Sequence, residues 1–286
     1  MKRILVIGGT GNVGSKTITK LLPAGVTVRA MVRNPETVTF PTQVEVIAGD
    51  LTLPHTLKKC LEDVEAVFLV WTAPAEAVAP ALQLITSNVK RIVFLSAPIY
   101  TPHPFFQASI PNPISVLHEK VEQQIKASGV KYTFLRPGML ASNSIAWWAP
   151  QMRAGDLIRW PYLNAPTAPI DEFDVASVAI HTLLENGHEG AEYVLTGPES
   201  LTQFEQLSAI GQAIGRKLGI EEISQKEAKS VWQPTWPAFA KDMLLKSWAA
   251  ALGQSAYVSN TVEEVTGRSP RTFSQWAYDN AAAFQC

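Results

Sequence analysis

Charged residues are scarce in this chain, and neither sign is in excess. Asp, Glu, Lys and Arg make up 17% of the 286 residues, and the formal net charge is −1. A protein that binds nucleic acid, or that docks electrostatically on a membrane, needs a cluster of basic side chains. We therefore expect neither nucleic acid nor a membrane among its partners.

Cysteines and long apolar runs are also few. The two cysteines, Cys60 and Cys286, cannot form a disulfide framework, and the five histidines lack the spacing of metal ligands. An apolar run such as Ala66–Trp71 is far shorter than the roughly 20 residues that cross a bilayer. Glycines interrupt the apolar segment near the N-terminus, which argues against a signal peptide. We expect a cytoplasmic monomer or homodimer that acts on a small molecule and holds no metal.

The most informative segment that is present is Ile4–Gly14. An apolar strand there runs into a glycine-rich turn and then a helix, the geometry that holds a dinucleotide pyrophosphate. Gly8 would permit the tight turn, and Gly14 would let the helix pack closely on the strand. The spacing is Gly-x-x-Gly-x-x-Gly rather than the standard Gly-x-Gly-x-x-Gly. The predicted cofactor contacts in this segment are Gly8, Thr10, Gly11, Asn12, Val13 and Gly14.

The first half of the chain alternates apolar strands with helical stretches, which predicts a parallel sheet covered by helices on both faces. The fold class is therefore α/β: a Rossmann-like doubly wound parallel sheet with a small C-terminal substrate-binding lobe. The predicted strands are Arg3–Ile7, Thr27–Val32, Val44–Ala48, Ala66–Val70, Arg91–Leu95 and Lys131–Leu135. The predicted helices are Asn12–Leu22, His55–Cys60, Ala75–Thr86 and Pro113–Ala127.

Beyond residue 140 the alternation loosens. We divide the chain into an NAD(P)-binding domain, 1–140, and a C-terminal lobe, 141–286, that is partly interleaved with it. Ala141–Pro169 is rich in Trp and Pro and is predicted to form loops across the carboxyl edge of the sheet. The remaining predictions are a helix at Asp171–Glu185, a strand at Glu192–Leu195, a helix at Gln203–Ile214 and one or two aromatic helices in Trp232–Leu252.

The end of the second strand indicates which cofactor binds. An NAD site places a carboxylate there for the ribose 2′-hydroxyl, but this chain has Arg33. An arginine suits a 2′-phosphate through charge-assisted hydrogen bonds, so NADPH is favoured over NADH. The alternative is that Arg33 is merely a solvated surface residue.

Two further strand ends lie on the same predicted edge. Asp50 and Leu51 follow the third strand, where the carboxylate could meet the adenine or could simply form a turn. Trp71 and Thr72 follow the fourth strand, and Trp71 could equally contact the cofactor or pack inside the domain.

These motifs resemble those of the NmrA-like atypical short-chain dehydrogenase/reductases. The resemblance implies a Rossmann domain, a small C-terminal lobe and usually NADPH, in a family that includes reductases of quinones, dyes, imines and phenylpropanoids as well as redox-sensing regulators. It also implies cofactor contacts from Ser96, near the nicotinamide, and Pro137. Its motifs are Gly8–Gly14, Val32–Pro35, Gly49–Leu51, Leu95-Ser96, Ser128-Gly129, Phe134–Gly138, Asn143 and Leu195–Pro198.

The catalytic Tyr-x-x-x-Lys pair of typical short-chain reductases is missing. Ile114 stands at the tyrosine position and His118 at the lysine position. His118 is either a hydrogen-bonded core histidine or a catalytic group, acting as a ribose contact or proton donor. Glu122 could orient it or form a surface i,i+4 pair with it. Tyr100 is a second candidate proton donor if its proline-rich loop folds inward.

The aromatic residues of the second half have two interpretations. Trp147, Trp148, Trp160 and Tyr162 could line an apolar pocket for a flat substrate, or could pack between the lobes.

Together these features predict an NADPH-dependent oxidoreductase. The expected reaction is hydride delivery to an electron-poor, flat or cyclic small molecule, such as a quinone, an enone or an imine of secondary metabolism. Such acceptors need little proton assistance, which would make loss of the Tyr/Lys pair tolerable. The alternatives are a regulator that senses NADP without turnover, and a non-redox isomerase or cyclase on the same fold.

Overall fold

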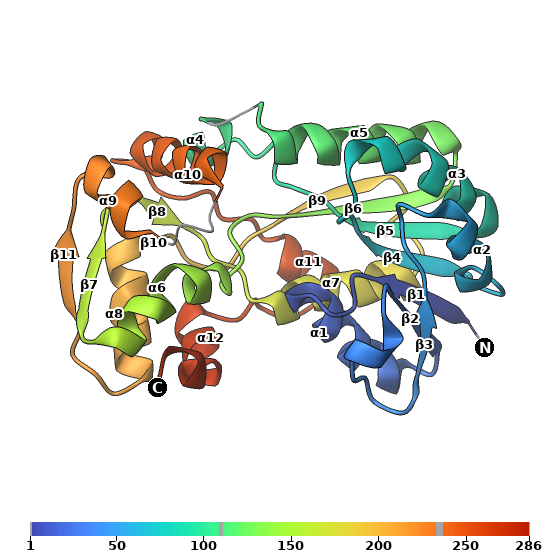
Figure 1. Cartoon of the computed structure of the whole chain (residues 1–286), viewed down its shortest axis with the longest axis horizontal. Coiled ribbons are helices and arrows are strands. Elements are labelled where there is room, and N and C mark those ends of the chain that lie inside the picture. The colour runs from blue at the N-terminus through green and yellow to red at the C-terminus, as the bar shows by residue number, and fades with distance from the viewer. Residues whose placement is uncertain (1, 109–110, 233–236, 286) are drawn as a thin grey trace.

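The computed structural model describes residues 2–108, 111–232 and 237–285. The chain forms two lobes side by side, a sheet lobe that holds the N-terminus and a smaller lobe built mainly from the second half (Figure 1). Within the described ranges, no helix is long and apolar enough to span a membrane.

A seven-stranded parallel sheet forms the centre of the sheet lobe, in the order β3-β2-β1-β4-β5-β6-β9. The order reverses between β1 and β4, and ligands of such sheets bind at this switch point, beyond the carboxyl ends of the strands. The predicted parallel sheet is therefore confirmed, with β9 added beside β6. The strands are β1 (Arg3–Ile7), β2 (Thr27–Val32), β3 (Val44–Ala48), β4 (Ala66–Val70), β5 (Arg91–Leu95), β6 (Lys131–Pro137) and β9 (Ala191–Leu195).

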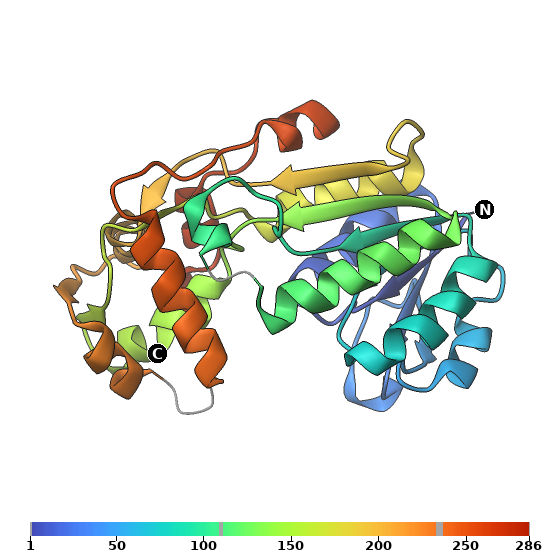
Figure 2. The same cartoon turned by 90° about the horizontal axis from the view of Figure 1, so that it is seen from above.

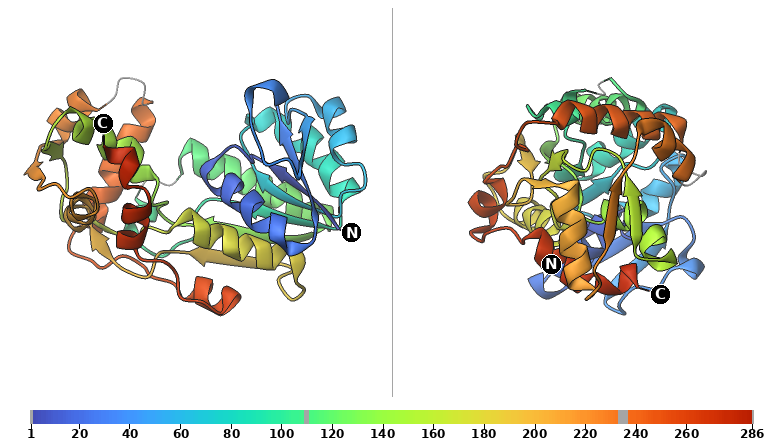
Figure 3. Two further views of the ribbon diagram at one scale, coloured as in Figure 1. Left: turned by 90° about the horizontal axis from the view of Figure 1, so that it is seen from below. Right: turned by 90° about the vertical axis from the view of Figure 1, so that its left-hand side faces the viewer.

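Helices cover both faces of this sheet because its strands are apolar on both sides. One face packs against α2 (Leu57–Cys60), α3 (Val78–Asn88) and α5 (Pro113–Ser128). The other packs against α1 (Asn12–Leu21), α7 (Glu172–Leu184) and α11 (Thr261–Thr266), as the left panel of Figure 3 shows for α1 and α7. Short 3-10 turns precede α2 and α3, at Pro54–Thr56 and Ala75–Ala77, and two more lie at Leu22–Ala24 and Pro35–Thr37.

The prediction that Ala141–Pro169 forms loops is wrong. This segment contains α6 (Asn143–Ala154), β7 (Leu157–Trp160) and β8 (Pro166–Thr167). Burial of Trp148 and Met152, both fully enclosed, stabilises α6 although Pro150 lies inside it. Tertiary packing therefore outweighs the low helix propensity of Trp and Pro.

The C-terminal lobe encloses a cluster of tryptophans. Trp148, Trp160 and Trp248 are fully buried, and ring centroids across the cluster are 5.2–6.3 Å apart. Trp148 and Trp160 therefore pack inside the C-terminal lobe, whereas the packing alternative had placed them between the lobes. The other elements of this lobe are α4 (Pro104–Gln107), β10 (Leu201–Thr202), α8 (Gln203–Ala213), β11 (Gly219–Glu222), α9 (Gln225–Val231), α10 (Ala238–Ala251), α12 (Phe273–Asp279) and a 3-10 turn at Ala281–Phe284.

The predicted aromatic helices of Trp232–Leu252 are represented by α10, while residues 233–236 lie outside the described residues. The helices predicted at 171–185 and 203–214 are confirmed as α7 and α8. Because β9, α7 and α11 pack in the sheet lobe, that lobe takes elements from both sides of residue 140.

Candidate active site

The glycine turn after β1 forms a cradle at the switch point. Gly8 has a φ of +87°, which favours glycine, and a Cβ there would lie 2.6 Å from Cβ of Val70. A Cβ on Gly14 would lie 2.1 Å from the carbonyl oxygen of Gly8, so only glycine allows α1 to start this close. No side chain caps α1, which leaves its first N–H groups for an anion. The turn therefore fits a dinucleotide pyrophosphate.

Arg33 and Asp50 lie near each other at the carboxyl edge. Hydrogen bonds from the backbone N–H and hydroxyl of Thr52 (2.8 Å each) to the Asp50 carboxylate are the main cause of its lowered pKa. The charge of Arg33, which is exposed directly after β2, lowers that pKa further. The contacts of Asp50 therefore agree with the turn interpretation, and Leu51, the next residue, is buried.

Of the two cofactor contacts predicted after β4, one side chain is buried and the other is exposed. Trp71 is 4% exposed, and its indole N–H donates to the carbonyl oxygen of Ala73 (2.7 Å), so it packs inside the domain. Thr72 is exposed next to it. Within the glycine turn, the exposed Asn12 donates from Nδ2 to Oγ of Ser142 (2.8 Å), which ties the turn to the start of the second lobe.

Ser96 belongs to a buried ionic network that sequence reasoning missed. Its hydroxyl donates to Oε1 of Glu122 (2.6 Å), and the guanidinium of Arg136 donates to both oxygens of that carboxylate (3.0 and 2.6 Å). Arg136 also pairs with Glu192 at 2.7 Å. Glu122 and Arg136 are only 2% and 3% exposed. Because Ser96 gives its single proton to Glu122, it can only accept a hydrogen bond from a ligand.

Glu122 is therefore not part of a surface pair, and both alternatives stated for it are wrong. Its carboxylate is hydrogen-bonded to Ser96 and Arg136, rather than to His118. The available signal was Arg136 itself, a charged residue at the end of an apolar strand, since a buried cation needs an anionic partner.

His118 is half-buried and packs against the sheet. Its ring stacks on Phe94 with centroids 5.7 Å apart, and its Nδ1–H donates to the carbonyl oxygen of Ile114 (2.9 Å). Burial lowers the pKa of this imidazole below its usual value. The neutral ring then carries its one proton on Nδ1, bound to the backbone, and has only a lone pair at Nε2.

Tyr100 is 56% exposed, and its side chain contacts Glu119 and Arg136. Its hydroxyl donates to Oε1 of Glu119 (3.0 Å), and its ring lies over the guanidinium of Arg136, 4.8 Å away. Desolvation and the hydrogen bond to Glu119 raise the pKa of this phenol.

A pocket of about 390 Å³ opens beside this network, between the two lobes. Its walls come from the loop after β5, α4, the N-terminus of α5, the start of α6, and α10. Helices α4 and α10 lie side by side there, as Figures 1 and 2 show. Trp147 reaches this pocket, but Tyr100 and His118 are not among the described residues that line it. The principal apolar walls are Ile99, Phe105, Phe106, Met139, Trp147 and Met243.

Asn143 supplies an amide to the pocket. Its Nδ2 lies 2.9 Å from Sδ of Met139, and a thioether is a weak acceptor that a ligand carbonyl could replace. From the sequence, Asn143 was named only as part of a family motif. No sequence pattern indicated that α10 would form the opposite wall of the pocket.

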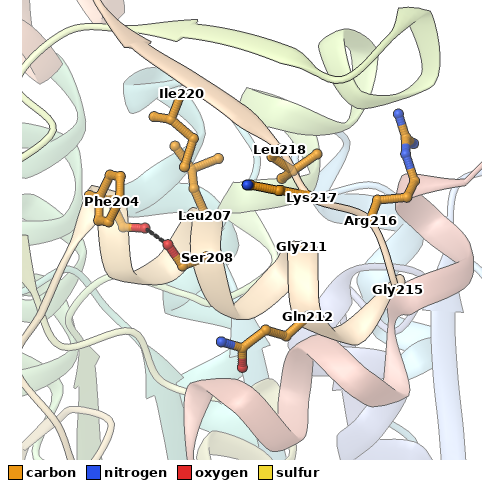
Figure 4. A pocket seen from close by; sticks show the side chains of 10 residues that line it. All are labelled: Phe204, Leu207, Ser208, Gly211, Gln212, Gly215, Arg216, Lys217, Leu218 and Ile220. Atoms are coloured by element: carbon orange, nitrogen blue, oxygen red, sulfur yellow. Dashed lines mark hydrogen bonds between the residues drawn. The ribbon is translucent and has the colours of Figure 1, made fainter.

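A second hollow, of about 450 Å³, lies in the C-terminal lobe along α8 and the segment that leads into β11 (Figure 4). Phe204, Leu207, Leu218 and Ile220 give it an apolar floor, and none of the predicted site residues lies in it. Among the described residues, no group of three or more His, Cys, Asp or Glu side chains is placed to hold a metal.

Comparison with known proteins agrees with this geometry. Residues 8–186 match the NAD(P)H-binding family. The chain is 35% identical to a (4-alkanoyl-5-oxo-2,5-dihydrofuran-3-yl)methyl phosphate reductase of Streptomyces griseus, over 98% of this chain and 99% of that one. It is 32% identical to an NAD(P)H azoreductase of Xenophilus azovorans, with the same coverage of both chains.

The fold is also that of a solved reductase. The Citrobacter sp. triphenylmethane reductase complexed with NADP(H) superposes with a TM-score of 0.79, at 22% identity, over 97% of this chain and 99% of that one.

Proposed function

The chain belongs to the NAD(P)H-binding family and is an oxidoreductase with the fold of NmrA, and from this premise we propose an NADPH-dependent reductase of electron-poor, flat or cyclic small molecules. The cofactor class and the family resemblance predicted from the sequence are thereby confirmed. The choice of NADPH over NADH and the class of substrate form the proposal.

The cofactor would lie along the carboxyl edge of the sheet. The glycine turn would hold its pyrophosphate, because the N–H groups at the start of α1 face outward without a side-chain cap. Arg33 would pair with a 2′-phosphate, since it is exposed at the end of β2. When bound, NADPH supplies a hydride. Ser96 would accept a hydrogen bond from the carboxamide of the nicotinamide, because its own proton is committed to Glu122.

The observation that carries the substrate class is the apolar pocket between the lobes. Its volume of about 390 Å³ and its aromatic walls suit a flat molecule of moderate size. The Streptomyces griseus relative is named for a substrate with an unsaturated ring lactone that bears an alkanoyl group, and the Xenophilus relative is named an azoreductase. Both names support a conjugated, electron-poor acceptor. A quinone, enone or imine of secondary metabolism fits the same description.

Protonation of the product would place little demand on this site. A reduced quinone leaves as a stabilised phenolate, so water can supply its proton, and a positioned side chain adds comparatively little. His118 and Tyr100 stay predictions as proton donors, although the contacts of both side chains favour structural roles.

The test follows NADPH consumption by absorbance against a panel of quinones, cyclic imines and enones. The variant Met243→Trp narrows the pocket and should abolish turnover while NADPH binding, measured by calorimetry, is retained. The matched control is Phe204→Trp in the hollow of Figure 4, which should change neither. Tight NADPH binding without consumption across the panel would refute the reductase and favour a sensing regulator.

A further inference from the structure

The pocket between the lobes carries no formal charge. None of its described lining residues is Asp, Glu, Lys, Arg or His. The segments 109–110 and 233–236, outside the described ranges, contain no charged residue in the sequence either. The polar lining side chains are all neutral and belong to Asn112, Ser115, Asn143 and Ser247.

Two of these polar groups are already engaged with each other. Oδ1 of Asn112 accepts from the backbone N–H of Ser115 (2.9 Å), and Oγ of Ser115 accepts from the N–H of Asn112 (3.0 Å) and donates to its carbonyl (2.9 Å). This capping box starts α5 and fixes both side chains. An ionic group of a ligand would therefore meet no opposite charge on these walls and few groups that could replace its water.

Charges behind the walls are compensated as well. Arg136, two residues before the lining residue Gly138, is neutralised by Glu122 and Glu192. His103 lies behind Phe106, and burial lowers the pKa of its imidazole. Its Nδ1 accepts from the backbone N–H of Phe105 (3.2 Å), which requires a ring nitrogen without a proton.

We propose that this pocket selects uncharged substrates and excludes molecules whose inserted part bears a phosphate, sulfonate or carboxylate. The inference rests on the assignment of this pocket as the substrate site under the proposed function. It separates the chain from its Streptomyces griseus relative, which is named for a phosphate ester. The two proteins would share a reaction class and differ in the charge that the substrate site accepts.

The first experiment compares 2-methyl-1,4-naphthoquinone with 1,4-naphthoquinone-2-sulfonate at saturating NADPH. We expect kcat/KM to be at least about 100-fold lower for the sulfonate, because the anion must lose its hydration without gaining a partner. The sulfonate withdraws electrons and makes the ring easier to reduce, so intrinsic reactivity works against the expected result. Values of kcat/KM within about threefold of each other would overturn the proposal.

The second experiment adds a cation to the wall. Met243 lines the pocket from α10, and Met243→Lys keeps a long unbranched side chain while it adds a charge. We expect kcat/KM for the sulfonate to rise at least about tenfold, whereas the control Met243→Leu changes it less than about threefold. If Met243→Lys lowers Tm so far that the protein unfolds at the assay temperature, Ile114→Lys supplies the same charge. Ile114 also lines the pocket and is 42% exposed. No gain for the sulfonate in a folded variant contradicts the proposal.

Binding distinguishes this inference from the proposed function. Trp147 lines the pocket, so the part of the fluorescence quenching that is lost in Trp147→Phe reports occupancy in the protein saturated with NADP⁺, without turnover. Quenching by the neutral quinone but not by the sulfonate supports charge selection even if no compound in the panel is reduced. Equal quenching together with equal reduction rejects charge selection and leaves the reductase intact.

Discussion

Replacing Glu122 with Gln tests the buried network behind the candidate nicotinamide position. The carboxylate of Glu122 accepts from Ser96 and takes a bidentate contact from Arg136, and all three side chains are buried. Glutamine keeps one oxygen, but its NH₂ group would face Nη2 of Arg136 at the position where the present distance is 2.6 Å. Two donors would then oppose each other, so the ion pair cannot simply become a neutral hydrogen bond.

The size of the effect follows from which contacts survive. Breaking a buried ion pair costs about 3–5 kcal/mol when the remaining charge is left unpaired. Here Arg136 keeps Glu192 at 2.7 Å, and the side chain of Glu192 is 30% exposed, so part of the charge stays compensated. We expect the free energy of unfolding to fall by about 2–3 kcal/mol, which lowers Tm by about 4–10 °C for a chain of this size.

Thermal unfolding followed by circular dichroism, with and without NADPH, measures this change. The control is Glu119→Gln on the same helix, whose carboxylate bonds the exposed Tyr100 and should shift Tm by less than about 2 °C. Because the glutamine side chain must move to relieve this contact between two donors, the oxygen that fixes the Ser96 hydroxyl moves with it, and NADPH affinity should fall as well. A Tm equal to that of the wild type would refute the role of the network, since a buried ion pair cannot be broken at no cost.

Three further predictions follow from single residues. Arg33→Ala should weaken NADPH binding at least about tenfold by calorimetry while NADH changes less than about twofold, and equal losses would show that Arg33 does not meet the 2′-phosphate. Burial raises the pKa of Asp174 to about 6, so the native state holds a proton that the unfolded chain has lost, and stability falls as pH rises from about 4 through 6. Asp174→Asn should therefore raise Tm by about 2–6 °C at pH 8 and not at pH 4; an equal gain at both would contradict this. His118→Ala should lower Tm through loss of the Phe94 stack with kcat unchanged, whereas a large fall in kcat at saturating NADPH would make His118 catalytic.

Local pattern predicted the sheet lobe well because each of its elements carries its own signal. Parallel strands buried on both faces are continuous apolar runs, and α5 begins at Asn112-Pro113 and ends at Gly129, which is left-handed with a φ of 76°. The same reasoning gave a wrong prediction for α6 in the C-terminal lobe. Its helix depends on tryptophans that are buried only after α10 and β7 pack around them, and no local pattern states that.

The sequence by itself predicted the NAD(P)H-binding family, because the glycine turn lies within one strand–turn–helix unit and carries its own signal. Only the tertiary structure decided what surrounds the carboxyl edge of the sheet beyond that turn. The pairing of Ser96 with Glu122 and Arg136, and the neutral pocket closed by α10, join residues up to about 150 positions apart in the chain. The first of these contacts arises from how α5 packs on the sheet and the second from how the two lobes meet, and the spacing of residues along one element encodes neither.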